Sequence, residues 1–439
     1  MFLLTTLSIA ALPALALGHN NNHLFQARQA STTSSSAAAS SSGSTSAASG
    51  SSASGASVTA ASSGASSLPA PSVSLLSTNP TAVPLTQIVS NAPSAATGSV
   101  TTTFAAGSTP SAISGAPGLP DISKLSPSNY PALDTPPPTD SAEVQQWIKD
   151  VANSGVTIPD IPLTVAGGCP SNPNAVTNAS QNGWWTCGGY TRDTDIVDCP
   201  DKMTWGLTYD DGPAFYTPDL LAYLDQVNLK STFFTVGSRV ISFPGMLQEE
   251  YMAGHQIAVH TWSHPSLTTL SNEEIIAEFG WSKKVIYDVL GVTPNQFRPP
   301  FGDIDDRVRA IAKAMGLTPV IWTRISATAT FDTGDFDIHA GTITPQQVLQ
   351  NWENIMGNAS AIDTGFIVLE HDLFQQTVEL ATGYILPDAI AHGSYNIMPV
   401  ISCLNLPLSD AYIETNDNST NPPAVSGTSL PRELSMAMV

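Results

Sequence analysis

A pair of adjacent aspartates at the end of an apolar stretch is the first feature of this sequence that suggests chemistry. Residues 207–213 read LTYDDGP, so Asp210 and Asp211 follow a mostly apolar run and lead directly into a Gly-Pro turn. Two like charges at the end of a buried strand are costly unless a positive group lies beside them. We therefore expect a cation or a basic side chain next to this pair.

Ionisable side chains recur at the ends of other apolar runs, in VHTWSHP, FRPPFGD and FIVLEHD. They are His260, His264, Arg298, Glu370, His371 and Asp372. Any one of them alone is most simply read as an ordinary cap or turn residue. Four strands that deliver ionisable groups to one edge are harder to explain in that way. Because ligands bind at the carboxyl ends of parallel strands, we expect these side chains to form one site.

Two imidazoles and one carboxylate are a common protein ligand set for catalytic zinc, with positions left open for water and substrate. His260, His264 and one of the two aspartates fit this set. The other aspartate would then be free to act as general base toward water whose pKa the cation lowers to roughly 7. His371 could protonate a leaving group. The residues thus predict a metal-dependent hydrolase, without specifying the bond that it cleaves.

Short apolar runs alternate with helical patterns from residue 202 onward. Seven runs read as strands, namely MTWGLTY, STFFTV, QIAVHTW, NQFRPP, TPVIWT, GFIVLEH and YNIMPVIS, and each but the last precedes a helix. The helix predicted for residues 271–290 opens with a capping box, Ser271 and Glu274, and stops at Gly291. Alternation of this kind predicts a parallel sheet of the α/β class, open or closed into a barrel.

Five short motifs carry a resemblance to a known family. TYDDGP, HTWSHP, RPPFG, DTGDF and LEHD, in this order, resemble the motifs of the polysaccharide deacetylases, carbohydrate esterase family 4, also called the NodB homology domain. The leader, the Ser/Thr-rich stalk and the cysteine placement make the chain most similar to fungal chitin deacetylases. The resemblance covers roughly residues 199–403, and its first two motifs are together highly specific. It implies a distorted (β/α)7-type barrel of parallel strands alternating with helices.

The resemblance implies a role for each residue that matches a motif. Asp210 would be the general base, and His371 would be the general acid. Asp211, His260 and His264 would bind one divalent ion, Zn²⁺ or Co²⁺. The implied reaction is hydrolysis of the N-acetyl groups of N-acetylglucosamine units in chitin, which gives chitosan and acetate.

Further matches surround these residues. Arg298 would support the base and shape the groove, and Leu369 would line the pocket for the acetyl methyl group. Phe301 stands where the family usually has Tyr, whose backbone N–H helps to bind the oxyanion or the product acetate. That backbone role survives the change to Phe. Asp335 would orient and tune the general acid.

The fourth motif matches least well. The family usually reads Asp-x-x-Asp-Trp soon after its strand, whereas FDTGDFD lies several residues late and has Phe336 in place of Trp. Asp305, Asp332 or Asp337 could therefore take the tuning role instead of Asp335.

Two other functions remain open. An esterase that removes O-acetyl groups from xylan or another glycan would use the same metal site. A non-catalytic wall-binding protein would keep the fold but not the chemistry, and the presence of both aspartates, both histidines and His371 argues against it.

Composition divides the chain into five regions. Residues 1–18 read as a secretory signal peptide, since an apolar run too short for a membrane anchor ends in an A-x-A pattern. Residues 19–139 are predicted to be a disordered Ser/Thr/Pro-rich stalk. A loop-rich, cysteine-stapled extension is expected over 140–199 and the catalytic domain over 200–405. Residues 406–439 would be a tail, without the apolar run of a glycolipid-anchor signal.

Four cysteines in a secreted chain suggest two disulfides. Three pairings are possible. We favour Cys199–Cys403, which would tie together the two ends of one domain, and Cys169–Cys187 within the extension.

The remaining features concern the surface and its partners. Asn178, Asn358 and Asn418 lie in sequons for N-glycosylation. A net charge of −21, from 36 acidic against 15 basic residues, disfavours nucleic acid and anionic membranes as partners. We expect a secreted or wall-retained monomer without a transmembrane segment. The aromatic residues of GWWTCGGY, Trp184, Trp185 and Tyr190, could form a sugar-binding platform, although such residues more often pack on a neighbouring domain.

Overall fold

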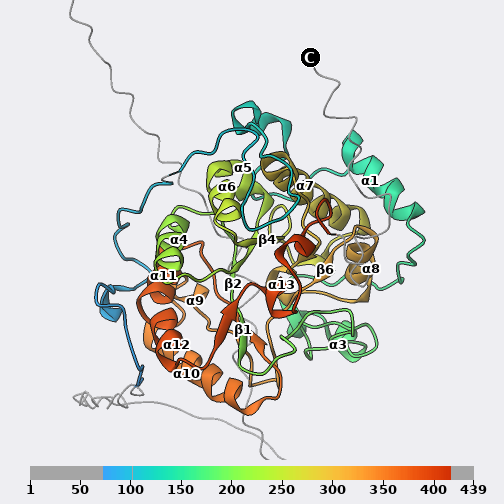
Figure 1. Cartoon of the computed structure of the whole chain (residues 1–439). Helices are drawn as coiled ribbons and strands as arrows, with labels where there is room; N and C mark the ends of the chain where they lie inside the picture. Colours follow the sequence, from blue (N-terminus) through green and yellow to red (C-terminus); the bar gives the residue numbers. More distant parts are fainter. Residues whose placement is uncertain (1–72, 101, 417–439) are drawn as a thin grey trace, which may run out of the picture.

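The computed structural model describes residues 73–100 and 102–416, and Figure 1 shows the whole chain. The predicted signal peptide, residues 19–72 and 101 of the predicted stalk, and residues 417–439 of the predicted tail lie outside the described residues. Short parallel strands occupy the middle of the described part, and helices are arranged around them.

The strands form two parallel sheets, ordered β7-β1-β8 and β2-β3-β4-β5-β6. Their bounds are β1 (Thr204–Gly206), β2 (Thr208–Asp210), β3 (Thr232–Thr235), β4 (Gln256–Val259), β5 (Gln296–Phe297), β6 (Thr318–Pro319), β7 (Phe366–Ile367) and β8 (Asn396–Met398). Strands β1 and β2 are two parts of one predicted run, interrupted at Leu207, so each of the seven predicted strands is found. An isolated parallel bridge between Asp210 and His371 and a hydrogen bond from Thr323 N to Ile367 O (3.0 Å) join the two sheets.

Helices follow the strands as the sequence predicts. Those of the catalytic region are α4 (Thr217–Gln226), α5 (Gly237–Ser242), α6 (Pro244–Met252), α7 (Asn272–Leu290), α8 (Asp306–Ala314), α9 (Phe336–His339), α10 (Pro345–Ala361), α11 (Gln375–Leu380), α12 (Leu386–His392) and α13 (Val400–Cys403). The capping box of Ser271 and Glu274 is formed at the start of α7, and Gly291 ends that helix with φ 78°. Local capping chemistry therefore sets both ends of the longest described helix.

The described residues contain further helices and short helical turns. The extension contains α1 (Ala142–Asn153), α2 (Gly168–Ser171) and α3 (Pro173–Thr177). The remaining turns are η1 (Leu85–Gln87), η2 (Ile122–Lys124), η3 (Pro127–Asn129), η4 (Leu267–Thr269), η5 (Pro300–Gly302), the π-helical turn η6 (Ala381–Ile385) and η7 (Leu408–Ala411).

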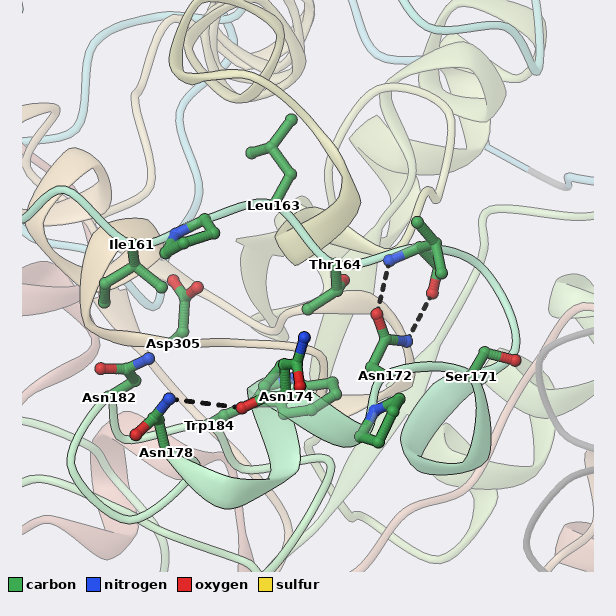
Figure 2. A pocket seen from close by; sticks show the side chains of 14 residues that line it. Ile161, Leu163, Thr164, Ser171, Asn172, Asn174, Asn178, Asn182, Trp184 and Asp305 are labelled. Carbon is green, nitrogen blue, oxygen red and sulfur yellow. Dashed lines mark hydrogen bonds between the residues drawn. The ribbon is translucent and has the colours of Figure 1, made fainter.

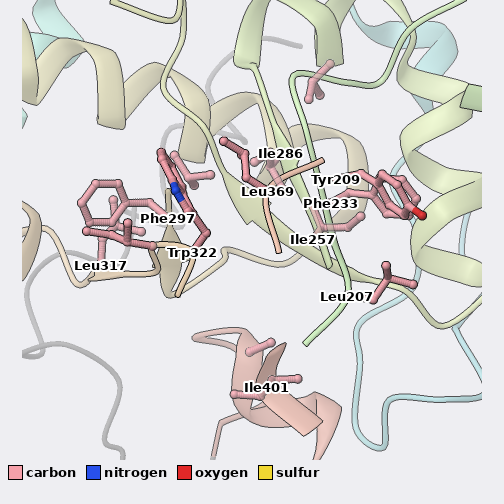
Figure 3. Packing of buried hydrophobic residues seen from close by; sticks show 14 of the residues in the cluster. Leu207, Tyr209, Phe233, Ile257, Ile286, Phe297, Leu317, Trp322, Leu369 and Ile401 are labelled. Atoms are coloured by element: carbon pink, nitrogen blue, oxygen red, sulfur yellow. The ribbon is translucent and has the colours of Figure 1, made fainter. Parts of the chain in front are cut away.

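The core lies between the strands and the surrounding helices. Every residue of β2, β3 and β4 is buried, as expected for parallel strands that are covered on both faces. Figure 3 shows part of this packing, with Tyr209, Phe233 and Ile257 from adjacent strands. This buried sheet is the rigid base from which the strand ends project.

The prediction of a disordered stalk to residue 139 is wrong for residues 73–139 in so far as they are described. This segment follows the outside of the catalytic region and buries Ile88, Ile113 and Leu119. Tyr384 donates from its hydroxyl to Val83 O (2.6 Å), and Gly98 N donates to the Asp219 carboxylate (2.8 Å). A prediction from average composition overlooks these apolar residues because they are widely spaced in the sequence. Each of them nevertheless packs into the hydrophobic core of the domain.

The predicted boundary at residue 405 is also too early. Tyr412 is fully buried, and its hydroxyl accepts a hydrogen bond from Ile257 N at the edge of β4 (3.0 Å). Asn295 N donates to Ala411 O (3.0 Å). Residues 406–416 therefore belong to the packed domain.

Both favoured disulfides are present, Cys169–Cys187 and Cys199–Cys403. The second joins residues 204 positions apart, just before β1 and at the end of α13. It ties the two ends of the catalytic region together. Among the described residues, no helix combines the length and apolar character that a membrane span requires.

Helix α1 packs on α7 at a glycine, and this contact yields a prediction. A Cβ added at Gly280 would overlap the Trp147 ring, whose centroid lies 5.5 Å from that of Trp281. Although Ala favours a helix over Gly by up to about 1 kcal/mol, we expect Gly280→Ala to destabilise the protein by about 1–3 kcal/mol through overpacking. Denaturant unfolding measures the change.

Gly357 in α10 provides the matched control, because a Cβ there meets no atom within 4 Å. Gly357→Ala should leave stability unchanged or raise it by up to about 1 kcal/mol. Equal effects of the two substitutions would contradict the packing argument.

Candidate active site

The predicted site residues gather at the carboxyl ends of the strands. Asp210 ends β2, His260 directly follows β4, and Arg298 directly follows β5. His371 follows β7 and is bridged to Asp210. The sheet thus brings together groups that are up to 161 positions apart in the chain, counted from Asp210 to His371.

Asp211, His260 and His264 form a cluster that could hold a metal ion. The Asp211 Oδ1 atom lies 3.3 Å from His260 Nε2 and 3.2 Å from His264 Nε2, and one ligand atom from each residue lies within 4.8 Å of the others. Ligands at ~2.0–2.1 Å from a tetrahedral zinc ion are separated by about 3.3 Å. Asp211 Oδ1 is buried without a hydrogen-bond partner, so the donor set fits a divalent cation.

The backbone and the protonation states prepare this cluster. The ring atom His260 Nδ1 lies 2.7 Å from Arg298 O, which fixes the tautomer that leaves Nε2 unprotonated. Burial lowers the pKa of His264 to about 3. Burial raises the pKa of Asp211, but the imidazoles of His264 and His260 outweigh it and hold that pKa well below its usual range. Asp211 and His264 can therefore offer lone pairs at neutral pH, and the tautomer of His260 directs the lone pair of Nε2 toward the same cluster.

Asp210 has a different positive partner. The Arg298 guanidinium is fully buried and donates to Asp210 Oδ1 (2.7 Å) and to Thr208 Oγ1 (2.8 Å). It also lies 4.2 Å from the centroid of the Phe234 ring. The second oxygen, Asp210 Oδ2, lies 3.8 Å from His260 Nε2 and faces the metal cluster. The carboxylates of the two aspartates thus have separate partners, Arg298 for Asp210 and the two imidazoles for Asp211.

His371 is oriented by Asp335. The two Asp335 oxygens contact His371 Nδ1 (2.7 Å) and accept from His371 N (2.8 Å). Burial lowers the pKa of His371, but the Asp335 carboxylate outweighs it, with help from Asp211 and Asp210, and raises the pKa to about 9. Of the other candidates for this contact, Asp305 instead caps α8 by accepting from Val308 N (2.9 Å).

Two aromatic side chains contact residues of the site, Phe301 at His264 and Phe336 at His371. Phe301 has a left-handed backbone (φ 60°), and its ring meets the His264 ring edge-on at 4.7 Å. Phe336, in place of the family's Trp, lies 5.1 Å from the His371 ring. Leu369 is buried, and its N–H donates to Phe331 O (2.8 Å); that it lines an acetyl pocket stays a prediction.

Two acidic residues beside His371 have no assigned role from the sequence. Burial raises the pKa of Asp372 to about 7, and its Oδ2 accepts from Thr217 Oγ1 (2.5 Å). Burial also raises the pKa of Glu370 well above its usual range. In the sequence, the position of both residues next to His371 is the signal that could have pointed to them. The hydrogen-bond partner of Asp372, Thr217, is 155 residues away, and nothing in the sequence pairs the two.

A further residue to which the sequence assigned no role is Asp303, which follows the RPPFG motif. Its Oδ1 accepts from Trp184 Nε1 (2.9 Å) and Thr186 Oγ1 (2.7 Å), and its Oδ2 accepts from Thr268 N (3.0 Å). Asp303 therefore clips the disulfide-stapled extension to the loop that carries Phe301.

This clip corrects the suggested sugar platform. Trp184 and Trp185 are 3% and 6% exposed, which leaves no face for a sugar to stack on. Trp185 instead packs against Trp322, with ring centroids 4.7 Å apart, and its ring occupies the space that a side chain at residue 302 would need. The two tryptophans serve as packing residues between the extension and the domain.

The same seam contains a pocket of about 320 Å³, shown in Figure 2. One wall is the segment from Ile161 to Val165, the opposite wall is α3, and Asp305 lines its base. Asn178, at the end of α3, lines the pocket and is exposed, so this sequon is accessible. Asn358 lies in α10 and is partly exposed, and Asn418 lies outside the described residues.

Comparison with known proteins agrees with the motif order. The sequence pattern of the polysaccharide deacetylase family matches residues 198–320. Chitin deacetylase 1 of Cryptococcus neoformans var. grubii is 55% identical over 340 residues, which cover 76% of this chain and 71% of that protein. The chitin deacetylase of Amylomyces rouxii is 38% identical over 244 residues, covering 53% of this chain and 55% of its own. The solved chitin deacetylase of Colletotrichum lindemuthianum aligns with 50% of this chain and 95% of its own, with 26% identity and a TM-score of 0.44.

The contact between Asp335 and His371 yields a prediction about protonation. Asp335→Asn removes the negative charge that contributes most to stabilising the imidazolium, so the pKa of His371 should fall from about 9. Nitrogen NMR of labelled histidine in metal-free protein follows the titration. Asp337→Asn, two residues away, is the control and should leave the pKa of His371 unchanged. A His371 titration that is the same in wild type and Asp335→Asn would contradict the assignment.

Proposed function

The chain belongs to the polysaccharide deacetylase family, and from this membership we infer that it is a hydrolase that removes N-acetyl groups from chitin, giving chitosan and acetate. The observation that carries this inference is the cluster of Asp211, His260 and His264 beside Asp210 and His371. The identity of 55% to a named chitin deacetylase supports chitin as the substrate.

Asp210 acts as the general base. Its Oδ1 is held by Arg298, so the carboxylate has one orientation, and its Oδ2 faces the metal cluster. That oxygen takes the proton of the attacking water. Arg298 is fully buried, and Thr208 holds it in place. Rotation of Asp210 away from it would therefore leave a buried positive charge without its counter-charge.

His371 acts as the general acid. Asp335 occupies its Nδ1, so Nε2 carries the proton that can be transferred to the leaving amine. The pKa of about 9 keeps the imidazole protonated at neutral pH. The base and the acid thus belong to neighbouring strand ends and start in opposite protonation states, as hydrolysis of an amide requires.

Asp211, His260 and His264 would hold the divalent cation, which we propose to be Zn²⁺ or Co²⁺. When bound, such an ion polarises the acetamide carbonyl and lowers the pKa of water. The Phe301 N–H is proposed as the second donor to the oxyanion, and removal of one such donor in other enzymes costs about 3–4 kcal/mol of barrier. Leu369 is proposed to contact the acetyl methyl group.

We propose secretion to the exterior or the cell wall, supported by the leader pattern and the two disulfides. N-glycosylation at Asn178 is supported by its exposure. A monomer and a closed barrel complete the proposal, the latter supported by the hydrogen bond from Thr323 N to Ile367 O.

Replacement of the base tests the reaction. Asp210→Asn keeps the shape of the side chain but cannot accept a proton, so acetate release from chitin oligomers should fall by roughly 10²–10⁴-fold, while bound metal is retained. Acetate release and metal content are measured on the same sample. Asp225→Asn, an exposed acid in α4, is the control. Wild-type activity of Asp210→Asn would reject the assignment, and faster release from acetylated xylan would favour the O-acetyl esterase.

Removal of the metal gives a second prediction. Dialysis against a chelator should abolish acetate release, and added Zn²⁺ or Co²⁺ should restore it. Zinc at 100 times its dissociation constant should also stabilise the metal-free protein by about 2.7 kcal/mol, because it binds the folded state. Asp211→Asn should reduce both responses. Activity that survives complete removal of metal would instead show that the chemistry does not need the ion.

A further inference from the structure

The turn between the two histidines of the metal cluster has an unusual backbone. Thr261, Trp262 and Ser263 connect His260 to His264, and both Thr261 (φ 64°) and His264 (φ 60°) lie in the left-handed region. Such a conformation costs roughly 1–2 kcal/mol for each residue other than glycine. The turn therefore persists only because surrounding groups hold it.

Glu278, in the second turn of α7, supplies that support. Its Oε2 accepts from Trp262 N (2.7 Å) and Ser263 N (2.9 Å), and its Oε1 accepts from Ser263 Oγ (2.5 Å). One carboxylate thus satisfies three donors from two adjacent residues of the turn. The contact spans 15–16 positions and joins the turn to a helix that the capping box fixes independently.

The carbonyl groups of the same turn are held from the opposite element. Gly237 N donates to Thr261 O (2.9 Å), and Ser238 N donates to Trp262 O (3.0 Å), both from the start of α5. Within the turn, His264 N donates to Thr261 Oγ1 (3.0 Å). Glu278 is accordingly the partner of the N–H groups, a task that the backbone of α5 does not perform.

Burial restricts Glu278 to contacts within the protein. Glu278 is fully buried, so it cannot contact a substrate from solution. A buried carboxylate contributes little to stability by itself, since its desolvation offsets the bonds that it forms. The contribution of Glu278 is therefore better sought in the geometry that it imposes on the turn than in the stability that it adds.

We propose that Glu278 is a positioning residue for the metal site, which holds the turn so that His260 and His264 direct their Nε2 atoms at one ion. This rests on the proposed function, because it assumes that the cluster binds a metal. Groups that orient metal ligands from outside typically change metal affinity by 10–100-fold when they are removed.

The test is a zinc titration of metal-free full-length protein in competition with a chelating dye. Glu278→Ala leaves the N–H groups of the turn without an acceptor, so we expect zinc binding about 10–100-fold weaker than in wild type. Glu278→Gln keeps one acceptor oxygen and puts an amide donor in place of the other, so part of the hydrogen bonding to the turn is retained and zinc binding should weaken less than in Glu278→Ala. Ser263→Ala removes one of the three bonds and should have the smallest effect.

Glu274 provides a matched control on the same helix. Its side chain accepts from Ser271 N (2.8 Å) in the capping box and does not touch the turn. Glu274→Ala should lower the thermal stability of the metal-free protein while zinc affinity stays at the wild-type value. This control separates a loss of stability from a loss of zinc affinity. If Glu278 served only the stability of the fold, Glu278→Ala would behave like Glu274→Ala and leave zinc affinity unchanged.

Wild-type zinc affinity in folded Glu278→Gln and Glu278→Ala would overturn the proposal. If Glu278→Ala does not fold, unchanged affinity in both Glu278→Gln and Ser263→Ala has the same consequence. An equal loss of affinity in Glu274→Ala would also overturn it, because the effect would then belong to α7 as a whole. Failure of the wild type to bind zinc would reject the proposed metal site itself, an outcome that the titration distinguishes from the others.

Discussion

Two carboxyl groups on adjacent residues, both almost fully buried, are the constraint on which this site depends. Asp210 and Asp211 would repel each other and resist burial unless each had its own positive or cation-binding partner. The fold solves this by sending the two side chains to different neighbours, Asp210 to Arg298 and Asp211 to the imidazoles. The division of labour between base and metal ligand therefore follows from how the charges are separated.

The scaffold makes that separation rigid. The strands are only two to four residues long, yet those under the site are buried throughout, so their ends are fixed by the core and not by loops. Helix α7, the disulfide-stapled extension and the segment from residue 73 then hold the loops that follow the strands. Asp303 and Trp262 are contact points of this outer layer, through Thr186 and Ala132 O respectively.

Two imidazoles at the same edge have opposite acid–base properties because their surroundings differ. Burial dominates for His264 and lowers its pKa to about 3, which suits a metal ligand. The Asp335 carboxylate dominates for His371 and raises its pKa to about 9, which suits a proton donor. Both imidazoles lie beside a carboxylate, but burial outweighs Asp211 at His264, whereas Asp335 outweighs burial at His371.

The sequence by itself determined the order of the strands, the capped helix at Ser271 and the residue types at the strand ends. These follow from local periodicity, capping and motif spacing, which act within a few residues. Tertiary structure alone decided that Asp335, and not Asp305, contacts His371, that Glu278 and Asp303 hold the loops, and that residues 73–139 pack on the domain. The reason is physical: a buried polar group is stabilised by whichever partner lies within hydrogen-bond distance, and for distant residues that distance is set by the packing of the whole chain.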